Sequence, residues 1–466
     1  MKRSKPSLRA QRRGAALLVS LIFIVLFSTL AVSMAAMSGS GLQIADNHRR
    51  MNAARTCAES GHQIVRYWLR DVAISGTTPA GQTYSALAAD IQTAAAFASG
   101  VVPTYDSTGI TIPQVTLDAA TGEAFTARIT PLPSAANPTA FRLDVTGASD
   151  GLTKTVRTEY RLTERANSVF DFGVATKGPL SLAGNILLEG VNIAVESSVY
   201  IESENDLLAL SIIGNSQIAG DVSVVNPLAM VYLQGGKAGI GGETGAAAID
   251  NHVTFGVPPA EFPEPDCSFF EPYVLNVIDA STDLSASATY DNVRIVAGTH
   301  PNFTGNVTLR GVVFIETPNI VTFSGNAVVI GMIVGDGDVE DDSGANRVTF
   351  SGTVDSHPLS ELPADEQFAD LRQYTGTFVL APGFSLSFGG NFNTLNGAIA
   401  ANGIQFYGNA GGTIAGSAIN YSDVQMTLTG NSDLYFNRSG ITHAPPGFVP
   451  QVVLAYNPAA YLELPY

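Results

Sequence analysis

The longest apolar run in the chain covers residues 15–37 and contains no charged side chain. As a helix it would be about 35 Å long at roughly 1.5 Å per residue, enough to cross a hydrocarbon layer of about 30 Å. Small apolar and aromatic residues then recur at spacings of three, four or seven: Ile44, Met51, Ala54, Ala58, Gly61, Val65 and Trp68. This spacing predicts a second helical segment with one apolar face. Between the two, Ser and Gly at 38–41 predict a kink or a flexible joint.

Apolar and polar residues alternate farther along the chain. A short Ala-rich helix is predicted at 84–98, and strands are predicted at 112–118, 123–130, 140–147 and 152–163. Asp150-Gly151 lies where a tight hairpin turn would join the last two strands. A long helix followed by an antiparallel meander is therefore expected for residues 38–168.

After residue 168 the chain repeats a short phrase with spacings near twenty residues. The phrase contains Gly-Asn at Gly184-Asn185, Gly214-Asn215, Gly305-Asn306, Gly325-Asn326, Gly390-Asn391, Gly408-Asn409 and Gly430-Asn431. Short strands separated by residues that tolerate positive φ favour a parallel β-helix, with the runs at 311–315 and 397–401 as buried strands. An antiparallel β-sandwich is the alternative, although its turns would come more often.

The fold class predicted is thus an α+β N-terminal part followed by an all-β domain, a parallel β-helix. The boundaries expected are 1–14 for a basic leader, 15–37 for a membrane helix, 38–168 for the helix and meander, and 169–440 for the repeats. The repeats are interrupted near 257–275 and near 355–374. The Pro-rich tail, residues 441–466, is expected to cap the last rung of the solenoid.

The charges are distributed unevenly. Through Arg70 there are eleven basic and two acidic residues, whereas from Lys177 onward seven basic residues face 29 carboxylates. Basic residues before an apolar helix stay on the cytoplasmic side, which predicts a single-pass inner-membrane protein with the rest of the chain outside. A net charge of −17 argues against nucleic-acid binding.

The start of the apolar run has a distinctive junction. Arg12-Arg13-Gly14-Ala15 places one Gly between a basic leader and the helix. A cleaved secretory signal and a plain signal anchor are the alternatives, and a lipoprotein is excluded because Cys57 comes too late. The junction resembles the processing site of type IV pilin-like proteins. The resemblance implies that a prepilin peptidase cuts after Gly14 and leaves Ala15 as the mature N-terminus.

Two further features refine the resemblance. Most pilins carry Glu five residues after the cut, but this chain has Val19 there, which points away from a major subunit. The segment 47–61, with its Ala-rich helix and Ala58-Glu59-Ser60-Gly61, resembles the N-terminal region of PilX-type minor pilins and pseudopilins. The resemblance implies packing against other pilin-like subunits in a type IV pilus or related secretion filament, and display of the β-helix at the cell surface for adhesion or assembly priming.

Candidate chemistry is sparse in the sequence. Asp336, Asp338 and Glu340 are the densest carboxylates and suggest a weak Ca²⁺ site, but Asp341 and Arg347 depart from the EF-hand pattern. No catalytic motif occurs, so no cofactor and no enzymatic activity are expected. Surface polysaccharide is a candidate ligand. The alternative function is that of a signal-anchored surface β-helix protein that binds or degrades such a polysaccharide. The sequence does not decide whether Cys57 and Cys267 form a disulfide, because Cys57 would also suit a packed position on an Ala-rich helix.

Overall fold

The computed structural model describes residues 11–70, 72–203, 207–439 and 443–464. The chain forms two compact units. The helix–meander unit contains Met1–Ile74, Thr78–Thr163 and Val453–Tyr466, and the solenoid unit contains Ser75–Thr77 and Glu164–Val452. The solenoid is therefore inserted into the sequence of the other unit. The predicted fold class, a long helix with an antiparallel sheet and a parallel β-helix, is confirmed.

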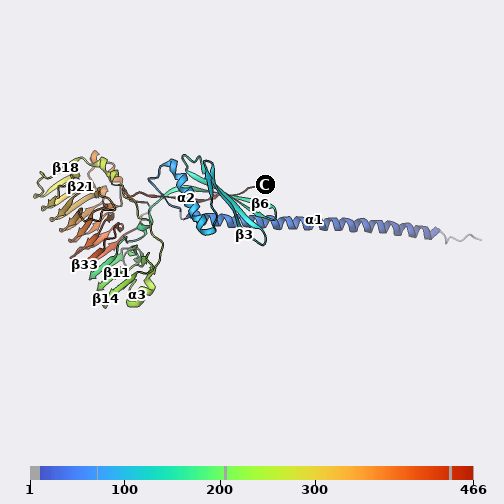
Figure 1. Cartoon of the computed structure of the whole chain (residues 1–466), viewed down its shortest axis with the longest axis horizontal. Coiled ribbons are helices and arrows are strands. Elements are labelled where there is room, and N and C mark those ends of the chain that lie inside the picture. The colour runs from blue at the N-terminus through green and yellow to red at the C-terminus, as the bar shows by residue number, and fades with distance from the viewer. Residues whose placement is uncertain (1–10, 71, 204–206, 440–442, 465–466) are drawn as a thin grey trace, which may run out of the picture. The chain divides into compact units, whose positions relative to one another are not determined.

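The helix–meander unit begins with one helix, α1 (Gln11–Arg70), which is 60 residues long (Figure 1). It continues through the Ser-Gly segment at 38–41, so the expected kink is absent. Two helical Gly residues cost about 1 kcal/mol each relative to Ala, which the strong helix formers on either side offset. In its second half Ala54, Ala58, Val65 and Trp68 are buried, as the apolar stripe predicted, whereas Ile44 is exposed.

The second half of α1 packs on an antiparallel sheet. Its central strands, β3 (Gly109–Asp118), β4 (Glu123–Leu132), β5 (Ala140–Ser149) and β6 (Leu152–Arg165), confirm the predicted meander. Asp150 and Gly151 both have positive φ in the predicted turn. Helix and strand approach closely where a Cβ on Gly147 would collide with the backbone of Ala54. The remaining elements are β1 (Ile74–Ser75), α2 (Ala80–Ser99) and β2 (Thr104–Asp106).

The last strand of the chain also belongs to this sheet. The strand order is β1-β35-β6-β5-β4-β3-β2, so β35 (Gln451–Leu464) lies between β1 and β6. Tyr456 on β35 lies beside His62 and Tyr160, with ring centroids 5.8 and 5.5 Å away. The expectation that this tail caps the solenoid is wrong: it completes the sheet of the other unit.

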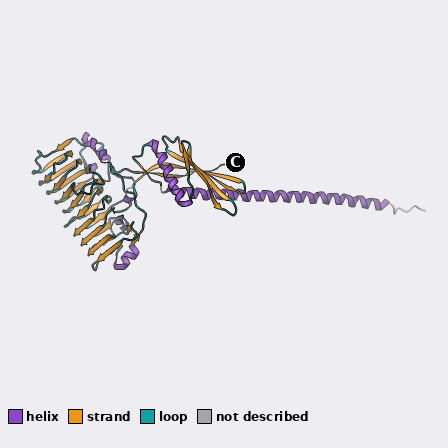
Figure 2. Ribbon diagram, viewed as in Figure 1, coloured by secondary structure: helices purple, strands orange, loops and turns teal. Residues whose placement is uncertain are grey.

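The solenoid has three sheets as its faces, visible as a stack of short strands in Figure 2, and the strand pairs are parallel except for β15 with β16. Face 1 has twelve strands: β7 (Val174–Thr176), β10 (Val199–Ile201), β13 (Val222–Val224), β17 (Val253–Phe255), β18 (Asn276–Ile278), β19 (Ala288–Ile295), β21 (Val307–Ile315), β23 (Ala327–Gly335), β25 (Val354–His357), β26 (Thr377–Ala381), β29 (Ala398–Ala401) and β32 (Ala418–Asn420). Face 2 has nine: β8 (Leu180–Gly184), β11 (Leu208–Gly214), β14 (Met230–Gln234), β20 (Asn302–Phe303), β22 (Ile320–Phe323), β24 (Arg347–Phe350), β27 (Ser385–Phe388), β30 (Ile404–Phe406) and β33 (Met426–Gly430). Face 3 has seven: β9 (Leu187–Gly190), β12 (Gln217–Ile218), β15 (Gly239–Ile240), β16 (Glu243–Thr244), β28 (Thr394–Leu395), β31 (Gly412–Ile414) and β34 (Leu434–Phe436).

Short helices punctuate the solenoid: α3 (Gly245–His252), η1 (Ser168–Asp171), η2 (Ala194–Ser197), η3 (Cys267–Tyr273), η4 (Leu359–Glu361), η5 (Glu366–Phe368) and η6 (Leu371–Gln373).

The rungs do not follow one another in chain order from end to end. The order in face 1 is β17-β13-β10-β7-β32-β29-β26-β23-β21-β19-β18. The chain therefore enters in the middle at β7 and winds outward to β17. It then passes residues 257–275 and winds back from β18 to β32, where Ala418 pairs in parallel with Val174. The first and last rungs are thus neighbours in the middle of the stack.

The interior is filled by side chains that stack from rung to rung. Five phenylalanines of face 2 form a ladder with centroid spacings of 4.8 to 5.1 Å and nearly parallel rings: Phe303, Phe323, Phe350, Phe388 and Phe406. Leu428, Leu182 and Ile212 continue the same column in register. Stacking of these rings at strand spacing gives a regular and fully buried core.

Gly-Asn pairs occupy a corner of the rungs, as the repeat predicted. Gly184 has φ +132° and Gly430 has φ +89°, and a Cβ on Gly184 would collide with the carbonyl oxygen of Gly430. The neighbouring asparagines form a ladder, in which Asn215 Nδ2 donates to Asn185 Oδ1 and Asn185 Nδ2 donates to Asn431 Oδ1, both at 2.8 Å. Gly184, Gly214 and Gly430 are therefore required for both conformation and close stacking, whereas Gly305, Gly325 and Gly390 have no positive φ and are required for close stacking alone.

Face 1 is buried on both sides. Val313 and Ile315 of β21 point into the solenoid, while Val312 and Phe314 pack outward against a second apolar cluster. That cluster includes Phe270, Phe368 and Phe448, from the two predicted excursions and the Pro-rich segment. Among the described residues, no strand of face 2 contributes to that cluster, and most face 2 strands are longer than those of face 3.

Candidate ligand-binding face

The outward side chains of face 2 form a polar column. Their register is fixed by parallel pairing, which aligns Asn302, Thr322, Thr349, Ser387, Gln405, Thr427, Ser181 and Ser211. Adjacent strands in a sheet lie about 4.8 Å apart, so hydroxyl and amide groups repeat at that spacing. The column arises because every second residue of each strand points into the phenylalanine ladder and its neighbour points out.

This face is almost free of charge. None of its nine strands contains Asp or Glu, and Arg347 is their single charged residue. The whole chain carries a net charge of −17, with 41 acidic residues. Carboxylates are thus concentrated elsewhere, and face 2 differs chemically from the rest of the molecule.

A groove of about 470 Å³ crosses four strands of the face. We call it the face 2 groove, and its lining is mostly polar: Arg347, Thr349, Ser385, Ser387, Gly403, Ile404, Gln405, Tyr407, Val424, Gln425 and Thr427. These residues come from β24, β27, β30 and β33 and from the turns that flank them. Sequence reasoning missed this site, because its members are brought together by a register that the repeat alone does not define.

Tyr407 is positioned in the groove by a neighbouring glycine. The residue directly follows β30, and its backbone N–H donates to the carbonyl oxygen of Phe388 at 2.9 Å. A Cβ on Gly389 would collide with the Tyr407 ring. The ring therefore lies against the backbone of the adjacent rung, where it presents an aromatic surface to the groove.

Arg347 has a free guanidinium group. Within the described solenoid, every other arginine forms a hydrogen bond or an ion pair: Arg165, Arg294, Arg310, Arg372 and Arg438. Arg347 instead lies exposed at the start of β24. A planar guanidinium presents paired donors that match carboxylate geometry.

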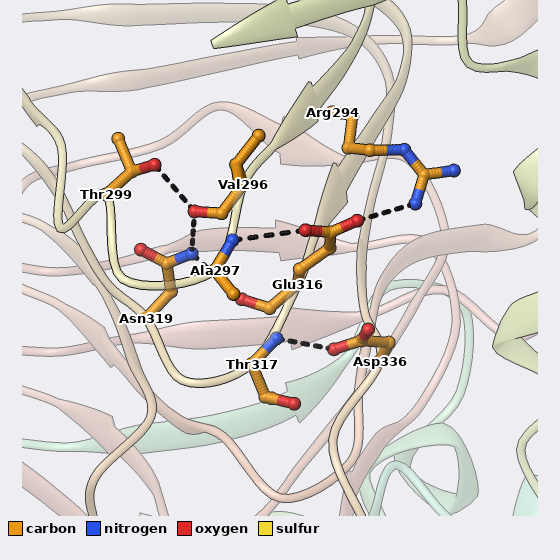
Figure 3. A network of polar contacts seen from close by, with 8 residues as sticks. All are labelled: Arg294, Val296, Ala297, Thr299, Glu316, Thr317, Asn319 and Asp336. Carbon is orange, nitrogen blue, oxygen red and sulfur yellow. Dashed lines mark hydrogen bonds and ion pairs between the residues drawn. The ribbon is translucent and has the colours of Figure 1, made fainter. Parts of the chain in front are cut away.

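A second polar cluster lies at the corner that follows β19, β21 and β23. Glu316 accepts from Arg294 Nη1 at 2.8 Å and from the Ala297 N–H at 3.1 Å, and Figure 3 shows how these groups lie. The hydrogen bond from Arg294 lowers the pKa of Glu316. Asn319 donates to the carbonyl oxygen of Val296 at 2.9 Å in the same network. All these groups are paired with each other, so the cluster fixes a turn.

Asp336 belongs to this corner, and the proposed calcium ligands do not form a site. Asp336 Oδ1 accepts from the Thr317 N–H at 2.7 Å, and partial desolvation raises the pKa of Asp336. Asp338 Oδ1 accepts from the N–H of Glu340 at 3.0 Å, which closes a local turn. Across the described residues, no three His, Cys, Asp or Glu side chains are grouped to hold a metal ion. The acidic run is a turn-forming loop, because its carboxylates bind nearby backbone N–H groups.

Both cysteines are free thiols. Cys57 is buried in the helix–meander unit, and Cys267 lies in the solenoid unit, where its Sγ donates to the carbonyl oxygen of Gly335 at 3.1 Å. Burial raises the pKa of Cys267 to about 12. The structure therefore agrees with the interpretation of Cys57 as a small residue packed in the core.

The predicted processing residues lie at the start of α1. Gly14 and Ala15 are within the helix, and Val19 is exposed. By length and composition, the described part of α1 from Ala16 onward is long and apolar enough to cross a membrane. Residues 1–10 of the predicted leader lie outside the described part of the chain, and cleavage after Gly14 stays a prediction.

The helix–meander unit contains a buried aromatic cluster that the sequence did not reveal. His62 on α1 is buried, with its Nε2 3.3 Å from Thr158 Oγ1 on β6. Burial and the nearby Arg66 lower the pKa of His62, and burial raises the pKa of Tyr160 to about 12. The Arg66 guanidinium lies 4.7 Å from the centroid of the Tyr456 ring. The cluster joins α1, β6 and β35.

No family model matches this sequence, and no curated protein matches it. Among solved structures, the competence-associated pilin ComZ from Thermus thermophilus is similar at 12% identity and a TM-score of 0.27. The alignment covers 89% of this chain and 97% of that one. An ice-binding protein from the Antarctic ascomycete Antarctomyces psychrotrophicus is similar at 12% identity and a TM-score of 0.19, covering 58% of this chain and 95% of that one. Both TM-scores are low, and neither neighbour assigns a family to this chain.

Proposed function

We propose that this chain is a minor pilin-like subunit of a type IV pilus or a related secretion filament, without enzymatic activity. The inner membrane holds it through the first part of α1 before assembly, and the solenoid is then displayed at the cell surface for adhesion or assembly priming. Its partners are a prepilin peptidase and the helices of other pilin-like subunits.

One observation carries the proposal. A single 60-residue helix exposes apolar side chains along its first half, while its second half is buried against an antiparallel meander. Leu18, Phe23 and Phe27 are each more than half exposed, which is costly in water and favourable in a bilayer or among similar helices. Such a helix suits lateral transfer from a membrane into a helical filament core.

Val19 supports a minor position in the filament. A carboxylate in a membrane segment is normally kept for a partner, and Val19 removes that charge. The subunit then enters the filament through apolar helix packing alone, which suits a subunit added in few copies.

The mature N-terminus tests the proposal. The full chain is produced in cells that possess a prepilin peptidase, and intact-mass and N-terminal peptide measurements locate the end of the chain. We expect a polypeptide that begins at Ala15 with a methylated amine. Gly14→Leu is expected to keep the leader, whereas the matched control Gly39→Ala, with open space around it in the same helix, is expected to be processed.

A wild-type chain that retains its leader in those cells would contradict the pilin-like function. It would support the alternative, a signal-anchored β-helix protein that binds polysaccharide at the surface. The polar face 2 groove favours binding as the role of the solenoid in either case.

A further inference from the structure

We propose that the face 2 groove binds an acidic polysaccharide, with Arg347 pairing to its carboxylate groups and the Tyr407 ring lying against a sugar ring. The inference rests on the proposed function for its setting, because a surface subunit is where such a ligand would be met. An acidic polysaccharide would be the ligand in the proposed adhesion, and Arg347 and Tyr407 would be residues that bind it.

Charge complementarity is the first argument. A polyanion is repelled by the carboxylates that give the chain its charge of −17, but the nine strands of face 2 carry none. Arg347 is their single charge, and its guanidinium has no partner in the described chain. An arginine left unpaired in an otherwise neutral groove is available for a bidentate hydrogen bond to a carboxylate.

The remaining lining suits a sugar chain. Ser385, Ser387 and Thr427 offer hydroxyl groups that both donate and accept, and Gln405 offers an amide with the same dual capacity. Tyr407 adds a half-buried aromatic ring with an apolar face and a polar tip. A protein partner normally buries an apolar centre, whereas the one exposed aliphatic side chain in this groove is Val424.

The repeat of the face favours a polymer over a single small molecule. The column of hydroxyl and amide groups continues in register on both sides of the groove, through Thr322 in one direction and Ser181 in the other. A chain of sugars crossing several rungs makes many weak contacts at once, which raises its overall affinity.

Binding of the full-length chain in detergent to immobilised glycans tests the inference. The probes are alginate as a carboxylated polysaccharide, dextran as a neutral one, and double-stranded DNA as a phosphate polyanion. We expect alginate to bind most tightly and its binding to weaken as salt increases. Arg347→Gln is expected to weaken alginate binding roughly tenfold, since a charge-assisted bidentate contact is lost.

Matched variants separate a specific contact from general charge. Lys237→Gln removes the same charge from an exposed position outside the groove and is expected to leave alginate binding unchanged. Arg347→Lys is expected to fall between wild type and Arg347→Gln because it keeps the charge and loses the paired donors. Tyr407→Phe is expected to retain binding, while Tyr407→Ala loses it. Thermal unfolding of each variant checks that the solenoid is intact.

Three results would overturn the inference. These are unchanged alginate binding by Arg347→Gln, equal binding of dextran and alginate, and preferential capture of DNA. The assay needs neither leader cleavage nor filament assembly, so its failure is distinguishable from failure of the proposed function.

Discussion

At the scale of single residues, the solenoid depends on what glycine and asparagine do at one corner. The Gly-Asn repeat was visible in the sequence and predicted the corner, because few residues other than Gly accept a strongly positive φ. The structure adds a second reason, since stacked rungs bring the α-carbon of Gly184 against the carbonyl oxygen of Gly430. Conformation and stacking therefore both select Gly184, whereas at Gly325 and Gly390, which have no positive φ, stacking alone selects glycine.

Replacing a stacked corner glycine should destabilise the solenoid. Gly184→Ala introduces a Cβ at φ +132° that collides with the backbone of the next rung. We expect a loss of about 2–4 kcal/mol in the free energy of unfolding. Denaturant unfolding followed by far-ultraviolet circular dichroism measures it.

The control separates strain from collision. Gly344 also has positive φ, at +70°, but open space surrounds its α-carbon. Gly344→Ala should cost about 1 kcal/mol. Equal losses for Gly184→Ala and Gly344→Ala would show that rung stacking contributes nothing to the requirement.

His62 should make the helix–meander unit less stable in mild acid. Burial and Arg66 hold the pKa of His62 below its ordinary value of 6.5, so the unfolded chain takes up a proton first as pH falls. Stability contributed by the neutral ring is therefore present above the unfolded pKa and is lost as pH drops below it. Trp68, the single tryptophan of the chain, is buried in this unit and reports its unfolding by fluorescence.

We expect the urea midpoint of the Trp68 signal to be lower at pH 5 than at pH 7 in the wild type. The difference should shrink in His62→Gln and stay unchanged in the control His48→Gln, which alters an exposed histidine on the same helix. The same pH difference in wild type and His62→Gln would assign it to other groups.

The candidate site shows where residue patterns alone fall short. The sequence drew attention to Asp336, Asp338 and Glu340 because they are close in number, yet the carboxylates of Asp336 and Asp338 accept from local backbone N–H groups. Arg347 and Tyr407 are sixty residues apart and carry no motif. They line the same groove only through the register β24-β27-β30, which the spacing of repeats does not specify.

At the scale of elements, the strongly periodic ones were predictable and those defined by distant partners were not. The meander, the helix at 84–98 and the interrupting excursions all followed from local pattern. In face 1, the continuous apolar runs at 311–315 and 397–401 predicted buried strands, and they lie in β21 and β29, which are buried on both sides. β35 contains Asn457 and Pro458, which favour turns, so its local sequence did not indicate a 14-residue strand.

Deleting β35 should destabilise the helix–meander unit and spare the solenoid. A chain that ends after Pro450 loses Tyr456, which covers His62 and Tyr160, and leaves β1 and β6 unpaired along one edge. We expect the Trp68 fluorescence transition to shift to lower urea while the far-ultraviolet signal of the solenoid keeps its midpoint.

A full-length control distinguishes the effect of losing the whole strand from the effect of losing one of its exposed side chains. Leu462→Ala shortens an exposed residue of β35 and should leave the Trp68 transition within about 0.5 kcal/mol of wild type. An unchanged transition in the truncated chain would mean that β35 contributes no stability to the sheet.

At the scale of the whole molecule, the order of the chain differs from the order in space. The solenoid unit is inserted between β6 and β35, and its own first and last rungs meet in the middle of the stack. The sequence indicated two kinds of structure but could not give this nesting, because each repeat has the same local pattern wherever it stacks. The sequence pattern of one repeat indicates that it forms a rung, but it does not indicate which other rung it pairs with.

The nested order has a consequence for biogenesis. During synthesis and export, the strands β7, β8 and β9 wait for β32, β33 and β34 to arrive more than 240 residues later. The sheet beside α1 waits longer still, for the final strand. The stack can close only after β34 has been synthesised, and the sheet beside α1 only after β35, so a translation product that stops before β32 leaves unpaired strand edges in both parts of the protein.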